Sequence, residues 1–234
     1  MLPFEMNEYR DRVARSLAAM EARGIDTLLV TNPGNMCWLT GYDGWSFYVH
    51  QLVILSSKLP EPIWVGRLMD ANAARVTTYL KPDSIRGYPD RYVQSTERHP
   101  MDYVADVLKE HGLDKSRIGL EMDVYYFTAA CYTTLVKDLP DADLVDATAL
   151  VNWQKIVKSP AEIACMRQAA AIVDAMMAAG IEKIEPGVRQ CDAVAEIYRV
   201  MASGTPEFGG EYSAIVPMLP TGEGTSTPHL TWSD

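Results

Sequence analysis

The chain has 234 residues, of which 48% are hydrophobic and 22% are charged, and its formal net charge at pH 7 is −10. This composition is typical of a globular protein with one large domain or two small ones. The acidic surface repels phosphate backbones and anionic lipids, so we expect neither nucleic acid nor membrane as a partner.

The N-terminal residues and the cysteine pattern of the sequence favour the cytoplasm. The N-terminal dozen residues contain acidic side chains and lack the apolar stretch of a secretory signal. The four cysteines are scattered, with no C-x-x-C pair. Scattered thiols behind no recognisable leader are typical of a reduced protein, so we expect cytoplasmic localisation.

Strands and helices alternate along residues 1–157, and this alternation predicts an α/β domain. A helix capped by Asn7 ends at Gly24, a buried strand occupies 25–30, and 32–35 predict a turn. The other predicted elements are paired strands at 51–57 and 62–67, a helix from Asp70 to Leu80, a helix from Pro100 to Gly112, a strand at 117–122, a helix at 127–139, a strand at 142–147 and a connecting helix near 149–157.

The pattern changes near residue 157, where we place a domain boundary. Ser159, Pro160 and Glu162 have the spacing of a capping box, and the helix behind them carries one apolar stripe. A second helix is expected after Pro186-Gly187 and before Gly204.

The last segment is predicted to contain two strands, one at 208–220 and one at 228–234, joined by the glycine-rich loop TGEGTST. Two such strands leave an unpaired sheet edge, so we interpret 158–234 as the first part of a larger domain. The loop lacks the lysine of a phosphate-binding loop, and the sequence has no H-E-x-x-H or G-x-S-x-G motif.

Residues 41–50, GYDGWSFYVH, have the most unusual composition in the chain, with two glycines and four aromatic side chains. On composition alone, a partly buried loop is favoured over a loop whose Trp45, Phe47 and Tyr48 contact a ligand or partner. Arg67 is a candidate to add charge to such a site, and the alternative is an ordinary surface position.

The chain has four histidines, and none belongs to a recognisable motif. His229 is predicted to lie on a short strand after a proline, where a structural role is more common than a functional one. His50, His99 and His111 rank below it as functional candidates.

The order of these elements resembles the creatinase, aminopeptidase P and prolidase family. The resemblance is carried by the capped helix that opens with KSPAEI, the second helix after EPG, and the PHLTW segment. It implies a creatinase-like N-terminal α/β domain at 1–157. It also implies that 158–234 are the first part of a pita-bread α+β catalytic domain, truncated before its later strands.

Three segments, NMCWLTGYDGWSFYVHQ, FGGEYSAIVPMLPTG and PHLTWSD, resemble the creatinase-like branch of the family that opens the cyclic amidine ring of ectoine. This resemblance implies a small-molecule hydrolase that yields an N-acetylated diaminobutyrate, with His229 as the proton-transfer group. It also implies a homodimer in which an aromatic loop of one subunit reaches the active site of the other. The substrate-binding residues implied are Trp45, Phe47, Tyr48, Arg67 and Tyr212.

The resemblance leaves the metal and two other functions open. Peptidases of this family use two divalent metal ions and creatinase uses none. The ligand positions lie beyond this chain, so we expect no metal cofactor. The alternatives are a metallopeptidase acting on Xaa-proline bonds and a non-catalytic dimerisation fragment.

Overall fold

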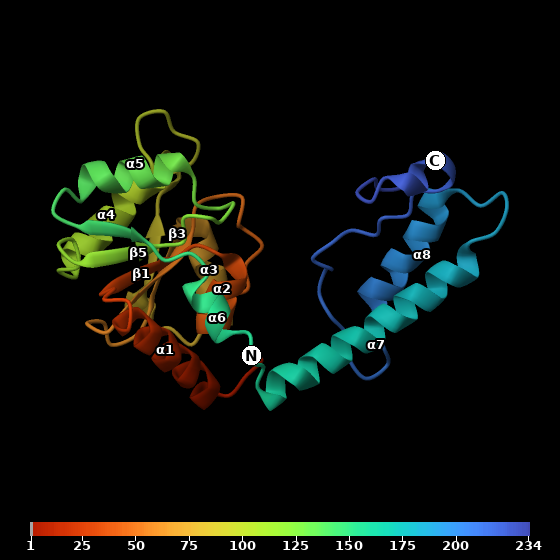
Figure 1. Cartoon of the computed structure of the whole chain (residues 1–234), viewed down its shortest axis with the longest axis horizontal. Coiled ribbons are helices and arrows are strands. Elements are labelled where there is room, and N and C mark those ends of the chain that lie inside the picture. The colour runs from red at the N-terminus through yellow and green to blue at the C-terminus, as the bar shows by residue number, and fades with distance from the viewer. Residues whose placement is uncertain (1) are drawn as a thin grey trace. The chain divides into compact units, whose positions relative to one another are not determined.

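The computed structural model describes residues 2–234 and divides the chain into two compact units, one ending at Val157 and the other spanning Lys158–Asp234 (Figure 1). The first is an α/β domain, and the second is built on two helices.

A six-stranded mixed sheet forms the centre of the first unit, with the order β4-β3-β2-β1-β5-β6. β2 pairs antiparallel with both β1 and β3, whereas β3/β4, β1/β5 and β5/β6 are parallel pairs. The predicted pairing of the strands around residues 51–57 and 62–67 is confirmed. The strands are β1 Thr27–Val30, β2 Leu52–Ser56, β3 Ile63–Arg67, β4 Ile85–Tyr88, β5 Arg117–Leu120 and β6 Asp143–Asp146.

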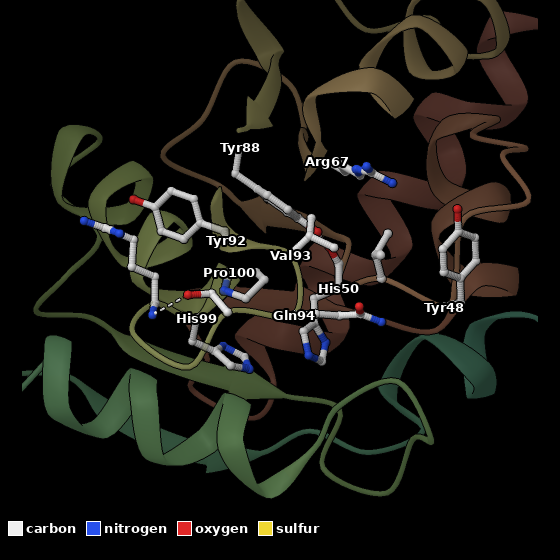
Figure 2. A pocket seen from close by; sticks show the side chains of 12 residues that line it. Tyr48, His50, Arg67, Tyr88, Tyr92, Val93, Gln94, His99 and Pro100 are labelled. Carbon is white, nitrogen blue, oxygen red and sulfur yellow. Dashed lines mark hydrogen bonds between the residues drawn. The ribbon is translucent and has the colours of Figure 1, made fainter. Parts of the chain in front are cut away.

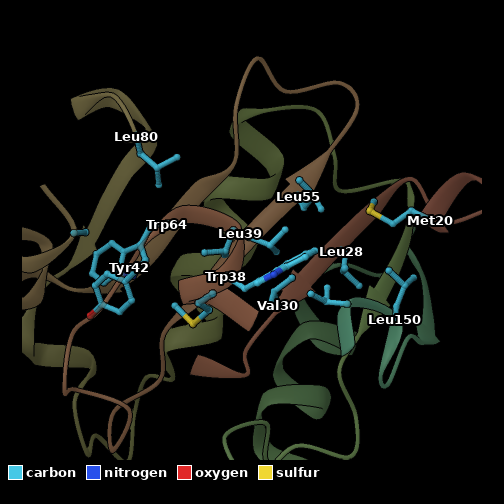
Figure 3. Close-up of a cluster of buried hydrophobic side chains, with 14 of the residues drawn as sticks. Met20, Leu28, Val30, Trp38, Leu39, Tyr42, Leu55, Trp64, Leu80 and Leu150 are labelled. Carbon is cyan, nitrogen blue, oxygen red and sulfur yellow. The ribbon is translucent and has the colours of Figure 1, made fainter. Parts of the chain in front are cut away.

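Helices cover both faces of this sheet (Figure 1). Side chains alternate along each strand, so Leu28 and Val30 pack into one hydrophobic cluster while Leu29 packs into the other. Figure 3 shows the first cluster, which contains residues of α1, α2, α3 and α6. The second contains residues of α4 and α5. The helices are α1 Met6–Glu21, α2 Pro33–Thr40, α3 Ala71–Thr77, α4 Pro100–Glu110, α5 Ala129–Asp138 and α6 Leu150–Gln154.

Several local predictions for the first unit are wrong at their boundaries. Residues 32–35 begin α2, because the Asn32 side chain accepts the Asn35 N–H at 3.2 Å and Pro33 occupies the first helical turn. Asn-Pro serves a turn and a helix start equally well. α1 begins after Glu5, so Asn7 is not its cap, and the helix predicted from Asp70 to Leu80 spans Ala71–Thr77.

The short strand β4 was not predicted. Its four residues carry little periodic signal, and it is held by parallel pairing with β3, a contact between separate parts of the chain. Such pairing depends on tertiary context more than on local propensity.

The second unit contains α7 Pro160–Lys183, α8 Gln190–Ser203 and a short 3₁₀ helix at Gly222–Ser226. The predicted capping box is confirmed. Ser159 Oγ accepts the Glu162 N–H at 3.1 Å, and the Glu162 carboxylate accepts the Ser159 N–H at 2.8 Å. α7 packs on α8 with Gly180 beside Ile197, so close that an added Cβ would lie 3.0 Å from the isoleucine side chain.

The predicted strands at 208–220 and 228–234 are wrong, because residues 208–234 contain no strand in the structure. A strand exists only through hydrogen bonds to a neighbouring strand. All six strands of the described residues pair within the sheet of the first unit.

By length and composition alone, α7 is the one described helix that would be long and apolar enough to cross a membrane. Apolar residues remain exposed along it, including Met166, Val173, Met177 and Ile181. Arg167 and Asp174 interrupt its apolar sequence.

Candidate functional site

The aromatic segment, residues 42–50, is positioned by the end of α2. Gly41 follows the helix with a φ of 84°, in the left-handed region, and its N–H donates to the Cys37 carbonyl oxygen. An added Cβ would lie 2.9 Å from the Thr77 carbonyl oxygen. Only glycine satisfies both conditions without displacing its neighbours, so this residue directs the chain into the aromatic segment.

A buried hydrogen-bond network closes the aromatic segment on itself. The Tyr42 hydroxyl lies 2.9 Å from Ser46 Oγ, and both hydroxyls lie 2.9 Å from Gln51 Oε1, which accepts from them. Tyr42 also packs against Trp64, with ring centroids 5.1 Å apart. These contacts hold both ends of the segment together, although Gln51 Nε2 is buried without a hydrogen-bond partner among the described residues.

With those polar groups turned inward, the segment presents its remaining aromatic rings outward. Trp45 and Tyr48 are 62% and 65% exposed. The Trp45 ring centroid lies 4.9 Å from that of Phe47 and 6.0 Å from that of Tyr48. Phe47 in turn contacts Tyr126, with centroids 5.8 Å apart. The structure therefore brings the three predicted aromatic residues into one exposed cluster.

Arg67 lies on the wall of a neighbouring pocket of about 410 Å³ that Tyr48 also lines (Figure 2). Its guanidinium is held by Asp90 through two hydrogen bonds of 2.8 and 3.0 Å. These bonds raise the pKa of Arg67 and lower that of Asp90. The structure thus places Arg67 beside Tyr48, with its charge already compensated by a carboxylate.

His50 and His99 lie at the same pocket, with ring centroids 4.8 Å apart (Figure 2). The His50 Nδ1 lies 3.6 Å from the Sγ of buried Cys131. Burial lowers the pKa of both imidazoles, and the proximity of His50 lowers that of His99 further. Burial also raises the pKa of the Cys131 thiol. Two neutral imidazoles therefore face a protonated thiol near neutral pH.

This His50/His99/Cys131 group was missed by sequence reasoning, which ranked both histidines low. Its members lie before β2, at the start of α4 and in the first turn of α5, so no short motif could reveal them. The one local signal is His-Pro at 99–100, where His99 Nδ1 caps α4 by accepting the Met101 N–H at 3.1 Å.

The other two predicted site residues, Tyr212 and His229, belong to the second unit. His229 is exposed and lies in a turn rather than on a strand. The segment around it is tied to the start of α8 by Gln190, which donates to Thr221 Oγ1 at 2.7 Å and accepts the Ser233 N–H at 2.8 Å. Tyr212 is 57% exposed.

Comparison with known proteins connects both units to one family. Residues 12–157 match the Creatinase/Prolidase N-terminal domain, and residues 164–234 match Metallopeptidase family M24. The chain belongs to the creatinase/prolidase family. The resemblance and the fold class inferred from the sequence, a creatinase-like α/β domain followed by part of a pita-bread domain, are confirmed.

Two curated relatives match this chain over its whole length. The chain is 51% identical to the ectoine hydrolase of Halomonas elongata in an alignment of 239 positions that covers all of this chain and 60% of that protein. It is 41% identical to an uncharacterized hydrolase/peptidase of Sinorhizobium fredii, again over all of this chain and 60% of the relative. The chain therefore spans about 60% of the length of these curated relatives.

A solved structure supports the fold. The Xaa-Pro dipeptidase from Bacillus anthracis is 21% identical, with a TM-score of 0.72 over 96% of this chain and 56% of that one. At this identity the likeness establishes a shared fold.

The prediction that the protein needs no metal cofactor is wrong. The second unit belongs to a metallopeptidase family, and His50, His99 and Cys131 form a group with metal-binding chemistry. Motif spacing missed this because metal ligands converge from distant parts of a chain. Among residues 2–234, this group is the one place where three or more His, Cys, Asp or Glu ligand atoms lie within 4.8 Å of one another. Among the described residues, 158–234 therefore contain no group of three or more such ligand atoms within that distance.

Proposed function

We propose that the protein is a hydrolase that opens the cyclic amidine ring of ectoine. The observation that carries this proposal is the 51% identity to an ectoine hydrolase, which extends over the whole of this chain. The substrate is a small cation that also carries a carboxylate, so binding requires aromatic faces and polar groups together.

Hydrolysis of an amidine forms one bond and breaks another. Water adds to the amidine carbon, and the bond from that carbon to one ring nitrogen then breaks. The water must lose a proton and the leaving nitrogen must gain one. A histidine suits both transfers because its ordinary pKa lies near neutrality. We assign this role to His229, which is exposed and therefore accessible to substrate.

The aromatic cluster Trp45/Phe47/Tyr48 supplies the cation-binding surface in this proposal. An amidinium stacked on such rings gains about 0.5–2 kcal/mol per cation–π contact. Arg67 lines the same pocket as Tyr48. Its guanidinium would bind the substrate carboxylate either together with Asp90 or in place of Asp90. Tyr212 is proposed to contact the substrate from the second unit. In a homodimer, the aromatic cluster of one subunit would cover the catalytic unit of the other.

The direct test is an activity assay on the protein expressed from its own gene. We expect ectoine to be converted into N-acetylated diaminobutyrate, detected by mass spectrometry, with no cleavage of an Xaa-proline dipeptide. The match to a metallopeptidase family favours dipeptide cleavage as the second candidate function. Both substrates should therefore be assayed with chelated and with metal-supplemented protein. Dipeptide cleavage without ectoine turnover would refute the first proposal.

Sharing of sites between subunits predicts complementation. Trp45→Ala and His229→Ala subunits are each expected to have reduced activity as homodimers, whereas a mixed dimer contains one site with both native residues. If subunits pair at random, half of the dimers are mixed and each has one native site of two, so about one quarter of the native activity per site should return, rising to about one half in purified mixed dimers. Activity is measured after co-expression with two affinity tags. Mixed dimers that remain inactive would show that both residues must come from the same chain.

A further inference from the structure

The His50/His99/Cys131 group has the geometry of a metal site. The Nδ1 atom of His50 and the Sγ atom of Cys131 are 3.6 Å apart. In tetrahedral zinc sites, Zn–N bonds of 2.0–2.1 Å and a Zn–S bond of 2.3 Å place nitrogen and sulfur about 3.5 Å apart. One ligand atom from His99 lies within 4.8 Å of the other two. The three groups therefore need only small side-chain movements to share one ion.

The chemistry of the donors selects the class of ion. Two imidazole nitrogens and one thiolate suit a borderline-soft divalent ion such as Zn²⁺, whereas Mg²⁺ and Ca²⁺ prefer oxygen ligands. His50 and His99 line the 410 Å³ pocket shown in Figure 2. A water molecule from this pocket would take the fourth position.

We propose that His50, His99 and Cys131 bind one zinc-class divalent ion at the pocket beside the aromatic segment. Cys131 binds as the thiolate, so each ion bound releases one thiol proton. In the metal-free chain His99 Nδ1 accepts the Met101 N–H, so Nε2 is the ring nitrogen open to the ion. Binding at Nε2 moves the ring proton to Nδ1, and the Met101 N–H then loses its acceptor. The second bond of that capping box, from the His99 N–H to Asp102 Oδ2 at 2.7 Å, is unaffected.

The ion would join three parts of the first unit that are distant in sequence. His50 ends the aromatic segment, His99 precedes α4, and Cys131 lies in the first turn of α5. Binding would therefore fix the aromatic segment against the helical layer formed by α4 and α5. This site lies in a different unit from His229 and does not depend on the ectoine proposal.

The test uses the 234-residue chain, reduced and freed of metal with a chelator. Zn²⁺ is titrated by calorimetry, and Co²⁺ serves as a spectroscopic probe of thiolate ligation. We expect one tight zinc site, a higher Tm with zinc, and a thiolate-to-cobalt charge-transfer band. His50→Gln and Cys131→Ser should each weaken zinc binding by about 100-fold or more, since removing a ligand costs at least as much as removing its supporting partner. His111→Gln and Cys165→Ser, at exposed positions, are matched controls and should bind as the native chain does.

The outcomes separate this site from any metal held elsewhere. Zinc that persists at full affinity in both His50→Gln and Cys131→Ser belongs to other residues and would overturn the proposal. Absence of the charge-transfer band in the native chain would overturn it too, and this measurement does not depend on whether a variant folds. In either case the 3.6 Å contact is an ordinary thiol–imidazole hydrogen bond.

Discussion

Replacing His229 with alanine is expected to lower ectoine turnover by about 10²-fold or more, the usual effect of losing a general acid–base group. The loss should fall on kcat rather than on KM, because the proposed role is proton transfer and not binding. His229 is exposed, so the free energy of unfolding should change by less than about 0.5 kcal/mol. The decrease in rate would then be chemical rather than structural.

The measurement compares kcat and KM of native protein and variant, with thermal unfolding as the folding control. His111→Ala removes another exposed imidazole, at the end of α4, and should leave both constants unchanged. A His229→Ala protein that retains native kcat would remove this residue from the proton-transfer step. The ectoine proposal would then require another acid–base group.

Local sequence signals predicted the parts of the structure that depend on neighbouring residues. The capping box of Ser159 and Glu162 forms as predicted because all its atoms lie within one helical turn. The clustering of Trp45, Phe47 and Tyr48 also depends on neighbouring residues, because three aromatic side chains within four residues lie close enough to make ring contacts.

Features that depend on distant residues were beyond prediction from one sequence. Arg67 was expected to supply charge, but its guanidinium is paired with Asp90, which follows β4, a strand that carries almost no periodic signal. The convergence of His50, His99 and Cys131 requires the packing of α4 and α5 on the sheet. In the second unit, the strands predicted at 208–220 and 228–234 do not form, since a strand requires hydrogen bonds to a partner strand.

Glu121 connects the fold of the first unit to its candidate site. This carboxylate is 1% exposed and follows β5, next to the end of β1. It accepts the N–H groups of Thr31 and Asn32 at 2.6 and 2.8 Å and the side-chain amide of Asn35 at 2.6 Å. These donors surround the start of α2, the helix whose other end positions the aromatic segment. Glu121 therefore compensates polar groups that would otherwise be buried without partners.

We expect Glu121→Gln to lower the free energy of unfolding by roughly 2–4 kcal/mol, since an unsatisfied buried donor costs about 1–3 kcal/mol and hydrogen bonds to a charged acceptor are the stronger ones. The amide keeps the size of the side chain but has only one acceptor oxygen, so at least one donor loses its partner. Urea unfolding is followed by the fluorescence of buried Trp38 and Trp64.

The matched control for this charge is Glu97→Gln, at an exposed position whose ion pair with Arg98 spans 3.6 Å. Exposed pairs of this kind contribute about 0–1 kcal/mol, so the control should unfold almost as the native chain does. Loss of stability confined to Glu121→Gln would assign the effect to the buried carboxylate. Equal stability of the two variants would mean that the amide oxygen alone satisfies the start of α2. The charge of Glu121 would then have no structural role in holding the aromatic segment.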